Sequence, residues 1–171
     1  MNWAWLRTFP WLDTRARFVA SLPKGAALLD LGASDGETLG HFAQLRPDLR
    51  FFAADKTGQP QKYPTGCKFH RADFERETLP WLDGSIDAIT CMHLIEHLHD
   101  LSLLLQEAAR LLKPGARIYF ETPHPKSLSL SSPRGLQQAR LRSISTMIPR
   151  MCDLSRLARW HKWFHAPALR S

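Results

Sequence analysis

The chain has 171 residues, of which 44% are hydrophobic, and its formal net charge at pH 7 is +7. This length suits one globular domain with a hydrophobic core, and the composition excludes a disordered chain. No apolar run reaches the roughly 20 residues that a membrane-spanning helix needs, so we expect no membrane partner. Three isolated cysteines form neither a CxxC pair nor a disulfide framework, which predicts a reducing, cytoplasmic location.

The excess of positive charge lies in one part of the chain. Residues 1–133 contain 15 basic and 15 acidic residues, whereas residues 134–171 contain eight basic residues and one acidic residue, Asp153. A neutral domain lacks the basic face that nucleic acid requires. We therefore expect no nucleic-acid partner for residues 1–133, and any such binding would be a property of the tail.

Short apolar runs alternate with segments of helical periodicity along most of the chain. Helices are expected over residues 13–21, 37–45 and 101–112. Strands are expected over residues 26–31, 51–54, 68–72, 86–91 and 116–120. The alternation predicts an α/β fold with a doubly wound, mainly parallel sheet. In such sheets ligands bind beyond the carboxyl ends of the strands, and here those ends carry Asp30, Asp55, Asp73 and Glu121.

Residues 28–36, with the sequence Leu-Leu-Asp-Leu-Gly-Ala-Ser-Asp-Gly, join the first strand to the second helix. Gly32 and Gly36 let the backbone approach a ligand closely. The carboxylates of Asp30 and Asp35 repel a pyrophosphate and favour a cationic ligand. The dinucleotide fingerprint GxGxxG is absent, which disfavours a nicotinamide-dependent dehydrogenase. A tight strand-to-helix turn with capping aspartates is the alternative interpretation of this segment.

Two further acidic residues follow the next two strands. Asp55 lies about twenty residues beyond Asp35, where a carboxylate can accept hydrogen bonds from both hydroxyls of a ribose. Asp73 and Phe74 together offer a carboxylate for an adenine amino group and an aromatic face beside it. Each residue alone is an ordinary strand-end residue. Three acidic strand ends in this order make a stronger pattern than any one of them.

The segment from Leu29 to Gly36 resembles the first motif of class I S-adenosylmethionine-dependent methyltransferases, in particular small-molecule enzymes of the type 11-like kind. Asp55 and Asp73 match the acidic residues of the next two motifs. Residues 86–98 and 111–118 resemble the passages around the fourth and fifth strands of the family. The resemblance covers about residues 28–123, and Ser34 replaces the middle glycine of the usual GxGxG.

The resemblance implies a Rossmann-like fold that uses S-adenosylmethionine as its cofactor. The implied binding residues fall into groups for the methionine, ribose and adenine parts: Asp30, Gly32, Ser34, Gly36, Cys91 and Met92; Asp55; and Asp73 with Phe74. The implied function is methyl transfer to a small-molecule acceptor, with O-methylation favoured. A catalytically silent module that only binds S-adenosylmethionine is the alternative.

A polar segment after the fourth strand supplies the candidate catalytic residues His97, Glu96 and His93. Similar small-molecule O-methyltransferases carry a Glu-His pair here, near the methyl acceptor. Related quinone-pathway enzymes have a further carboxylate three residues before that glutamate and bind a metal, and His93 stands at that position. Three roles are open: a general base for a hydroxyl, a ligand set for a divalent ion, or hydrogen bonds that only fix the loop.

Residues 134–171 depart from the resemblance. The family's fold ends with an antiparallel hairpin, but we expect no strand here, only a basic irregular tail with at most a helix over residues 154–164. The chain is thus divided into a cofactor-binding domain, residues 1–133, and a tail, residues 134–171, whose lack of the hairpin would impair activity. One choice of codons for residues 143–154 encodes Asn-Phe-Tyr-Asp-Asp-Pro-Thr-His-Val-Arg-Pro in another frame, which resembles an acceptor-side segment of the family. We therefore hypothesise that the tail is a frameshifted sequence.

Overall fold

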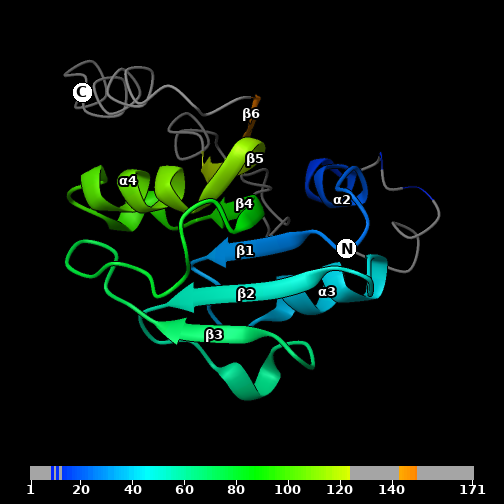
Figure 1. Ribbon diagram of the computed structural model, residues 1–171, viewed down its shortest axis with the longest axis horizontal. Helices are drawn as coiled ribbons and strands as arrows, with labels where there is room; N and C mark the ends of the chain where they lie inside the picture. The colour runs from blue at the N-terminus through cyan, green and yellow to red at the C-terminus, as the bar shows by residue number, and fades with distance from the viewer. Residues whose placement is uncertain (1–8, 10, 12, 124–142, 150–171) are drawn as a thin grey trace, which may run out of the picture.

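A six-stranded sheet lies between helices on both of its faces (Figure 1). The computed structural model describes residues 9, 11 and 13–123, and the backbone of residues 143–149. The helices are α2 (Thr14–Ala20), α3 (Glu37–Leu45) and α4 (Ser102–Leu111), with 3-10 turns η2 (Pro60–Lys62) and η3 (Ile95–His97). The strands are β1 (Ala27–Leu31), β2 (Arg50–Asp55), β3 (Lys68–Arg71), β4 (Ile86–Met92), β5 (Leu112–Pro123) and β6 (Ser143–Pro149). No helix in this part of the chain is both long and apolar enough to cross a membrane.

The strand order β3-β2-β1-β4-β5-β6 confirms the doubly wound α/β fold. Strands β1 to β5 are parallel to their neighbours, and β6 is antiparallel to β5. Strands β2 and β3 extend the sheet in one direction from β1, and β4, β5 and β6 extend it in the other. The order therefore reverses between β1 and β4, and the carboxyl ends of both strands open at this point.

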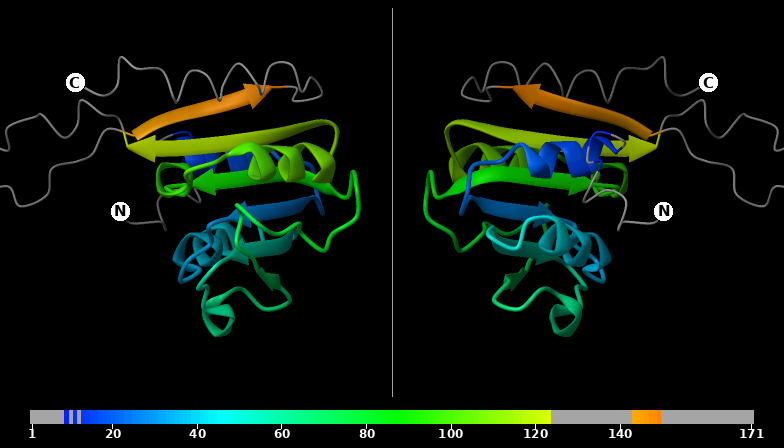
Figure 2. Two further views of the ribbon diagram at one scale, coloured as in Figure 1. Left: turned by 90° about the vertical axis from the view of Figure 1, so that its left-hand side faces the viewer. Right: turned by 90° about the vertical axis from the view of Figure 1, so that its right-hand side faces the viewer.

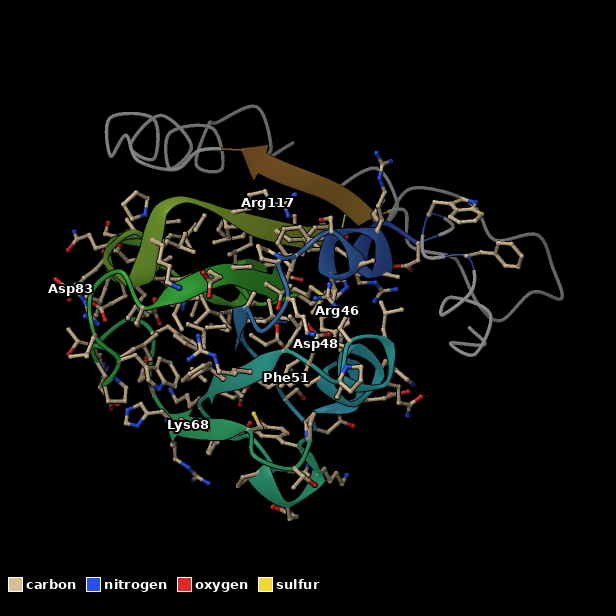
Figure 3. All side chains as sticks on the ribbon, turned by 45° about the vertical axis from the view of Figure 1, so that its right-hand side comes forward. Arg46, Asp48, Phe51, Lys68, Asp83 and Arg117 are labelled. Atoms are coloured by element: carbon tan, nitrogen blue, oxygen red, sulfur yellow. The ribbon has the colours of Figure 1, made fainter. Side chains whose placement is uncertain are left out.

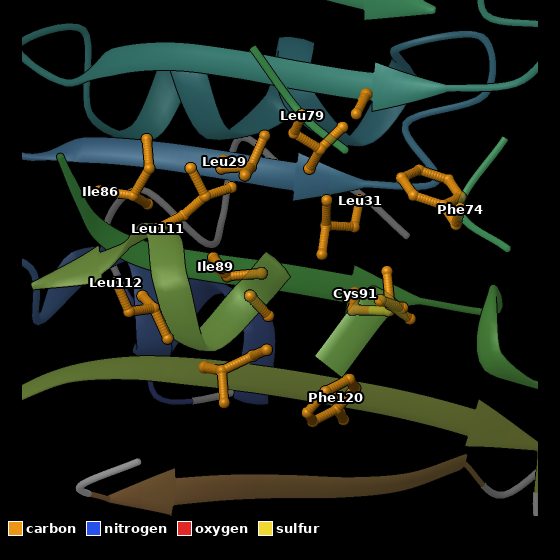
Figure 4. Packing of buried hydrophobic residues seen from close by; sticks show 14 of the residues in the cluster. Leu29, Leu31, Phe74, Leu79, Ile86, Ile89, Cys91, Leu111, Leu112 and Phe120 are labelled. Atoms are coloured by element: carbon orange, nitrogen blue, oxygen red, sulfur yellow. The ribbon is translucent and has the colours of Figure 1, made fainter. Parts of the chain in front are cut away.

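The two faces of the sheet pack against different helices, as the two views of Figure 2 show. Helix α4 covers one face through Leu104, Ala108 and Leu111, which pack with alternate strand residues such as Leu29 and Ile89 (Figure 4). Helices α2 and α3 cover the opposite face, where the core consists mainly of Phe18, Val19, Leu28, Leu39, Phe42, Ala53, Ala88 and Tyr119. Burial on both faces explains why the central strands are continuous apolar runs in the sequence.

Arg46, just after α3, joins the end of α2 to the turn before β2 (Figure 3). Its guanidinium donates to the carbonyl oxygens of Val19, Ala20 and Leu22 at 3.3, 3.1 and 2.9 Å. It also binds both carboxylate oxygens of Asp48, at 2.7 and 2.8 Å. This guanidinium holds the pKa of Asp48 well below its usual range. Arg46 therefore satisfies carbonyls that the end of a helix leaves without partners.

The tail contains a strand that the sequence analysis did not expect. Residues 143–149 form β6, which pairs with β5 from Arg117↔Pro149 to Pro123↔Ser143. The expectation that no strand follows residue 133 is therefore wrong, and β5 is paired on both sides. The β-branched residues Ile144, Thr146 and Ile148 alternate along this segment, which is the period of a strand. The helix expected over residues 154–164 lies outside the described residues.

Strand β5 also begins earlier than expected, at Leu112 rather than at residue 116. The pairing with β4 shifts in register between Ile86↔Leu112 and Ala88↔Arg117. Gly115 lies within this irregularity with a φ of 79°. The Pro114-Gly115 pair therefore bends the start of the strand instead of ending a helix before it.

Candidate active site

The carboxyl ends of β1, β2, β4 and β5 meet at one edge of the sheet, where the strand order reverses. The loop after β1 forms the first wall of this edge. Three of its residues adopt a left-handed backbone, with φ of 80° at Gly32, 48° at Ser34 and 80° at Gly36. The amides of Gly32 and Ala33 donate to the carbonyl oxygen of Ala54 in β2, at 2.9 and 3.3 Å. The expected glycine-rich turn is thus tied to the neighbouring strand.

Ser34, which replaces the middle glycine of the expected motif, is exposed and keeps the left-handed backbone of that position. A serine in this conformation carries a strain that a glycine does not. Three hydrogen bonds hold the backbone of Ser34 in this conformation. Its amide donates to Oδ2 of Asp55 at 2.9 Å. Its carbonyl oxygen accepts from the Tyr63 hydroxyl at 2.9 Å and from the Gln59 amide at 3.1 Å. The Tyr63 contact had no signal in the sequence.

Gly36 leaves no room for a side chain, because the Tyr63 ring occupies the space that a Cβ atom would fill. A Cβ built at Gly36 would contact Cδ1 and Cε1 of Tyr63, the second at 2.7 Å, and φ is also positive. We expect Gly36→Ala to lower the free energy of unfolding by about 2 kcal/mol and to weaken cofactor binding. Gly40 in α3 is a matched control, because a Cβ there meets nothing within 4 Å. Gly40→Ala should be neutral or stabilising, and equal losses in urea unfolding of the two variants would contradict this explanation.

Asp55 at the end of β2 is buried and accepts hydrogen bonds through both carboxylate oxygens. Oδ2 accepts from the Ser34 amide, and Oδ1 accepts from the Thr57 amide at 2.7 Å. Oδ1 also accepts from the Thr57 hydroxyl at 3.2 Å, so Oδ2 keeps a lone pair for one ribose hydroxyl, and a second ribose hydroxyl would replace that of Thr57 at Oδ1. Asp55 therefore both shapes the loop after β1 and has the capacity for the ribose contact that the resemblance implies.

Asp73 and Phe74, the expected adenine residues, follow β3 beside this edge. The Lys56 ammonium donates to Oδ2 of Asp73 at 3.0 Å and lowers the pKa of this carboxyl. The Phe74 side chain is 4% exposed and belongs to the core on the α4 face of the sheet, near the carboxyl end of β1 (Figure 4). An adenine amino group would share Asp73 with Lys56, and the contact of adenine with the Phe74 ring stays a prediction.

Asp30 lies within β1, beneath the loop, and is 3% exposed. Its Oδ1 accepts a hydrogen bond from the Thr90 hydroxyl in β4 at 2.7 Å. Burial raises the pKa of Asp30 to about 7, against the hydrogen bond from Thr90, which acts in the opposite direction. A cation bound above β1 would favour the ionised form. By contrast, Asp35 is partly exposed and accepts only from the Glu37 amide, at 3.2 Å, as a turn-capping residue does.

The raised pKa of Asp30 predicts a stability that decreases as the pH rises. The folded chain keeps the Asp30 proton up to about pH 7, whereas the unfolded chain loses it near pH 4, so the folded state binds more protons between these values. From pH 5 to 7.5 the free energy of unfolding should fall by about 2 kcal/mol in the wild type relative to Asp30→Asn. Urea unfolding of both proteins at the two pH values measures this, and a parallel pH dependence would exclude the assignment.

Cys91 and Met92, the expected residues on the methionine side, end β4 and face opposite cores. The Cys91 side chain is buried under α4, and burial raises the pKa of its thiol well above the usual value. The Met92 side chain is partly buried and packs with the core on the α2 side. Their backbone runs past the carboxyl end of β1, since Leu31 pairs with Cys91. The structure thus brings this pair next to the loop after β1.

His93 follows β4 directly and lies between two carboxylates. Its backbone is left-handed, with a φ of 53°, and its amide donates to the carbonyl oxygen of Glu121 at 2.8 Å. Nδ1 lies 3.3 Å from Oε1 of Glu96, and Nε2 lies 3.4 Å from Oε1 of Glu121. The side chain is still 48% exposed, so a ligand has access to it. Glu121 was expected only as an acidic strand end, and its place beside His93 had no signal in the sequence.

His97, the third candidate catalytic residue, lies in the exposed turn η3. Its amide donates to the Leu94 carbonyl oxygen at 3.0 Å, and within the described residues no hydrogen bond or ion pair of its imidazole is found. The described part of the chain also has no group of three or more His, Cys, Asp or Glu side chains placed to hold a metal. The geometry therefore favours His93 over His97 as the ordered imidazole of this site.

Comparison with known proteins gives the same family from sequence and from structure. A family model described as a methyltransferase domain matches residues 3–170. A ubiquinone biosynthesis O-methyltransferase of Xanthomonas axonopodis pv. citri (strain 306) is 29% identical over 107 residues, which are 58% of this chain and 44% of that protein. An uncharacterized 37.1 kDa protein in transposon TN4556 of Streptomyces fradiae is 31% identical over 115 residues, 64% of this chain and 33% of that protein. The chain thus spans less than half the length of these curated relatives.

Two solved structures illustrate the shared fold. An S-adenosylmethionine-dependent methyltransferase from Aquifex aeolicus has a TM-score of 0.57 at 17% identity, with 75% of this chain and 71% of that chain covered. A putative methyltransferase of Haloferax volcanii, solved in complex with the Trm112 activator, has a TM-score of 0.53 at 25% identity, with 71% and 56% covered.

Proposed function

Because the chain belongs to the methyltransferase-domain family, we propose that it binds S-adenosylmethionine at the carboxyl ends of β1 to β3 and transfers the methyl group to a hydroxyl of a small molecule. The observation that carries this proposal is the meeting of two groups at one edge of the sheet. The first is the left-handed loop after β1 with Asp30 and Asp55, and the second is His93 with its two carboxylates.

The residues of the first group fit the cofactor chemically. S-adenosylmethionine carries a positive charge on both its sulfonium and its ammonium group, and a cation bound above β1 would shift the buried Asp30 toward its ionised form and be stabilised by it. Asp55 Oδ2 has a lone pair for the ribose, and the exposed residue Ser34 lies next to it. When bound, this cofactor supplies a methyl group on a sulfonium, which leaves as a neutral thioether.

The second group would handle the acceptor. A hydroxyl is a weak nucleophile until its proton is removed, and a positioned imidazole is the usual base for this step near neutral pH. His93 is exposed enough to reach an acceptor, and its ring lies between the carboxylates of Glu96 and Glu121. O-methylation is also the activity in the name of the Xanthomonas relative. The separated cysteines, of which Cys67 and Cys91 are free thiols, favour a cytoplasmic enzyme.

Turnover with labelled S-adenosylmethionine and a panel of phenols and hydroxy acids tests this function. We expect transfer to at least one hydroxyl, and binding of S-adenosylmethionine that NAD does not displace. Binding without transfer to any member of the panel would instead identify a silent binding module.

The three roles considered for the segment after β4 predict different effects of mutation. We expect His93→Gln to lower kcat about 100-fold, the usual scale of general base catalysis, and His97→Ala to lower it less. The affinity for S-adenosylmethionine, measured by calorimetry, should change less than twofold in both. His99→Ala is the control in the same segment, and a chelator should have no effect on the wild-type rate. An equal loss of cofactor affinity and kcat would make these histidines structural, and inhibition by the chelator would restore the metal role.

A further inference from the structure

Glu121 lies in β5, two residues before the strand ends at Pro123, and other residues bind its carboxylate on the side away from His93. Its side chain is 7% exposed. The Tyr119 hydroxyl donates to Oε2 at 2.7 Å, and Nε of Arg15 in α2 lies 3.8 Å from the same oxygen. The Tyr119 hydroxyl is also 2.9 Å from Oγ1 of Thr14. One carboxylate oxygen is therefore fixed by α2 and β5, and the other, Oε1, is directed at His93.

Glu96, the other carboxylate beside His93, is held less firmly. It lies in the short turn η3, its side chain is 25% exposed, and Oε2 lies 3.3 Å from the Thr122 hydroxyl. An acceptor hydroxyl that enters the site can displace an exposed side chain more easily than a buried one with two fixed partners. The Nδ1 side of His93 is thus the open side, and the Nε2 side is closed.

We propose that Glu121 is a positioning residue that holds the Nε2–H of His93, so that Nδ1 carries the lone pair that receives the acceptor proton. The proposal rests on the proposed function of His93 as base. A neutral imidazole has one N–H donor and one acceptor nitrogen, and the partner of one nitrogen decides the state of the other. In the reaction the acceptor O–H bond breaks as its proton moves to Nδ1, the O–CH3 bond forms, and the C–S bond breaks with its electron pair going to sulfur. The carboxylate of Glu121 stabilises the imidazolium.

Two variants of Glu121 separate its hydrogen bond from its charge. Glu121→Gln keeps an oxygen that can accept from Nε2–H but removes the charge, whereas Glu121→Leu removes both. We expect kcat to fall about 10-fold in the first and about 100-fold in the second, within the usual range for acid–base assistance, while KM for S-adenosylmethionine changes less than twofold. Glu107→Gln is the matched control, because Glu107 is also buried and paired with an arginine, Arg110, but lies on α4. It should lower stability and leave kcat of the folded protein unchanged.

A measurement that needs no turnover decides the proposal even if the proposed function fails. Nitrogen-15 NMR of histidine-labelled protein at pH 9, with the His93 signal assigned from His93→Gln, reports which ring nitrogen carries the proton. We expect the Nε2–H tautomer in the wild type and in Glu121→Gln, and a mixture of tautomers in Glu121→Leu. The Nδ1–H tautomer in the wild type would overturn the proposal, as would a folded Glu121→Gln with the wild-type kcat. If Glu121→Leu does not fold, the wild-type and glutamine spectra still decide.

Discussion

Asp55→Ala should weaken the binding of S-adenosylmethionine by about 1.5 to 3 kcal/mol, as expected when hydrogen bonds to a charged acceptor are lost. The structure gives a second reason for the effect. The same carboxylate accepts from the amides of Ser34 and Thr57, so its removal also releases the loop that borders the cofactor. Asp55→Asn keeps one of these acceptors and should show a smaller loss. Calorimetric titration with S-adenosylmethionine and its demethylated product measures both effects.

The control for this experiment must remove a comparable carboxylate outside the site. Asp48 does not serve, because it binds Arg46 through both oxygens and accepts from the Gly25 amide. Asp87 is suitable: at the opposite end of the sheet it accepts from the Ala27 amide at 2.8 Å and from Lys113 at 2.7 Å. Asp87→Asn should lower stability but leave cofactor affinity unchanged. Unchanged affinity in a folded Asp55→Ala would remove Asp55 from the site.

Features that depend on local sequence were predictable. A strand buried on both faces is a continuous apolar run whatever the rest of the chain does, so β1 and β4 were found within a residue or two of their ends. Acidic residues at successive strand ends converge in any parallel sheet, which brought Asp30 and Asp55 to one edge. The family model of a methyltransferase domain, which matches residues 3–170, supports the family that the sequence motifs indicated.

Features that depend on distant contacts were not predictable. The hydroxyls of Thr14 and Tyr119, which hold the side of Glu121 away from His93, are 105 residues apart in sequence. Nothing near Gly36 indicates that Tyr63 would fill the space beside it. The motif after β4 also contains several histidines, and only the left-handed backbone at His93 and its position beside β5 distinguish it from His97.

Strand β6 changes the interpretation of the tail but leaves its origin as a hypothesis. The β-branched residues at positions 144, 146 and 148 indicate a strand, but the basic composition around them favoured an irregular segment. The nucleotide sequence of the gene decides whether residues 134–171 are frameshifted.

Deleting the residues after Pro123 should lower the free energy of unfolding by about 3 kcal/mol, at roughly 0.5 kcal/mol for each cross-strand pair. Seven residue pairs join β5 to β6, and without them β5 becomes an unpaired edge that carries Ile118 and Phe120. An unpaired apolar edge also promotes self-association. We therefore expect the truncated chain to melt at a lower temperature and to form larger species in light scattering.

A pair of point variants tests the pairing itself and not merely the length of the chain. Among the described strands β6 is the last of the sheet. Successive amides of such a strand point alternately toward the neighbouring strand and away from it, so of the adjacent residues Ser145 and Thr146 only one directs its amide at β5. Proline removes the amide hydrogen and is tolerated only on the outer side. Ser145→Pro and Thr146→Pro should therefore differ by at least about 1 kcal/mol in urea unfolding, since one loses a ladder hydrogen bond and the other does not. If both variants and the truncated chain were as stable as the wild type, β6 would add nothing to the fold, as expected of a frameshifted tail.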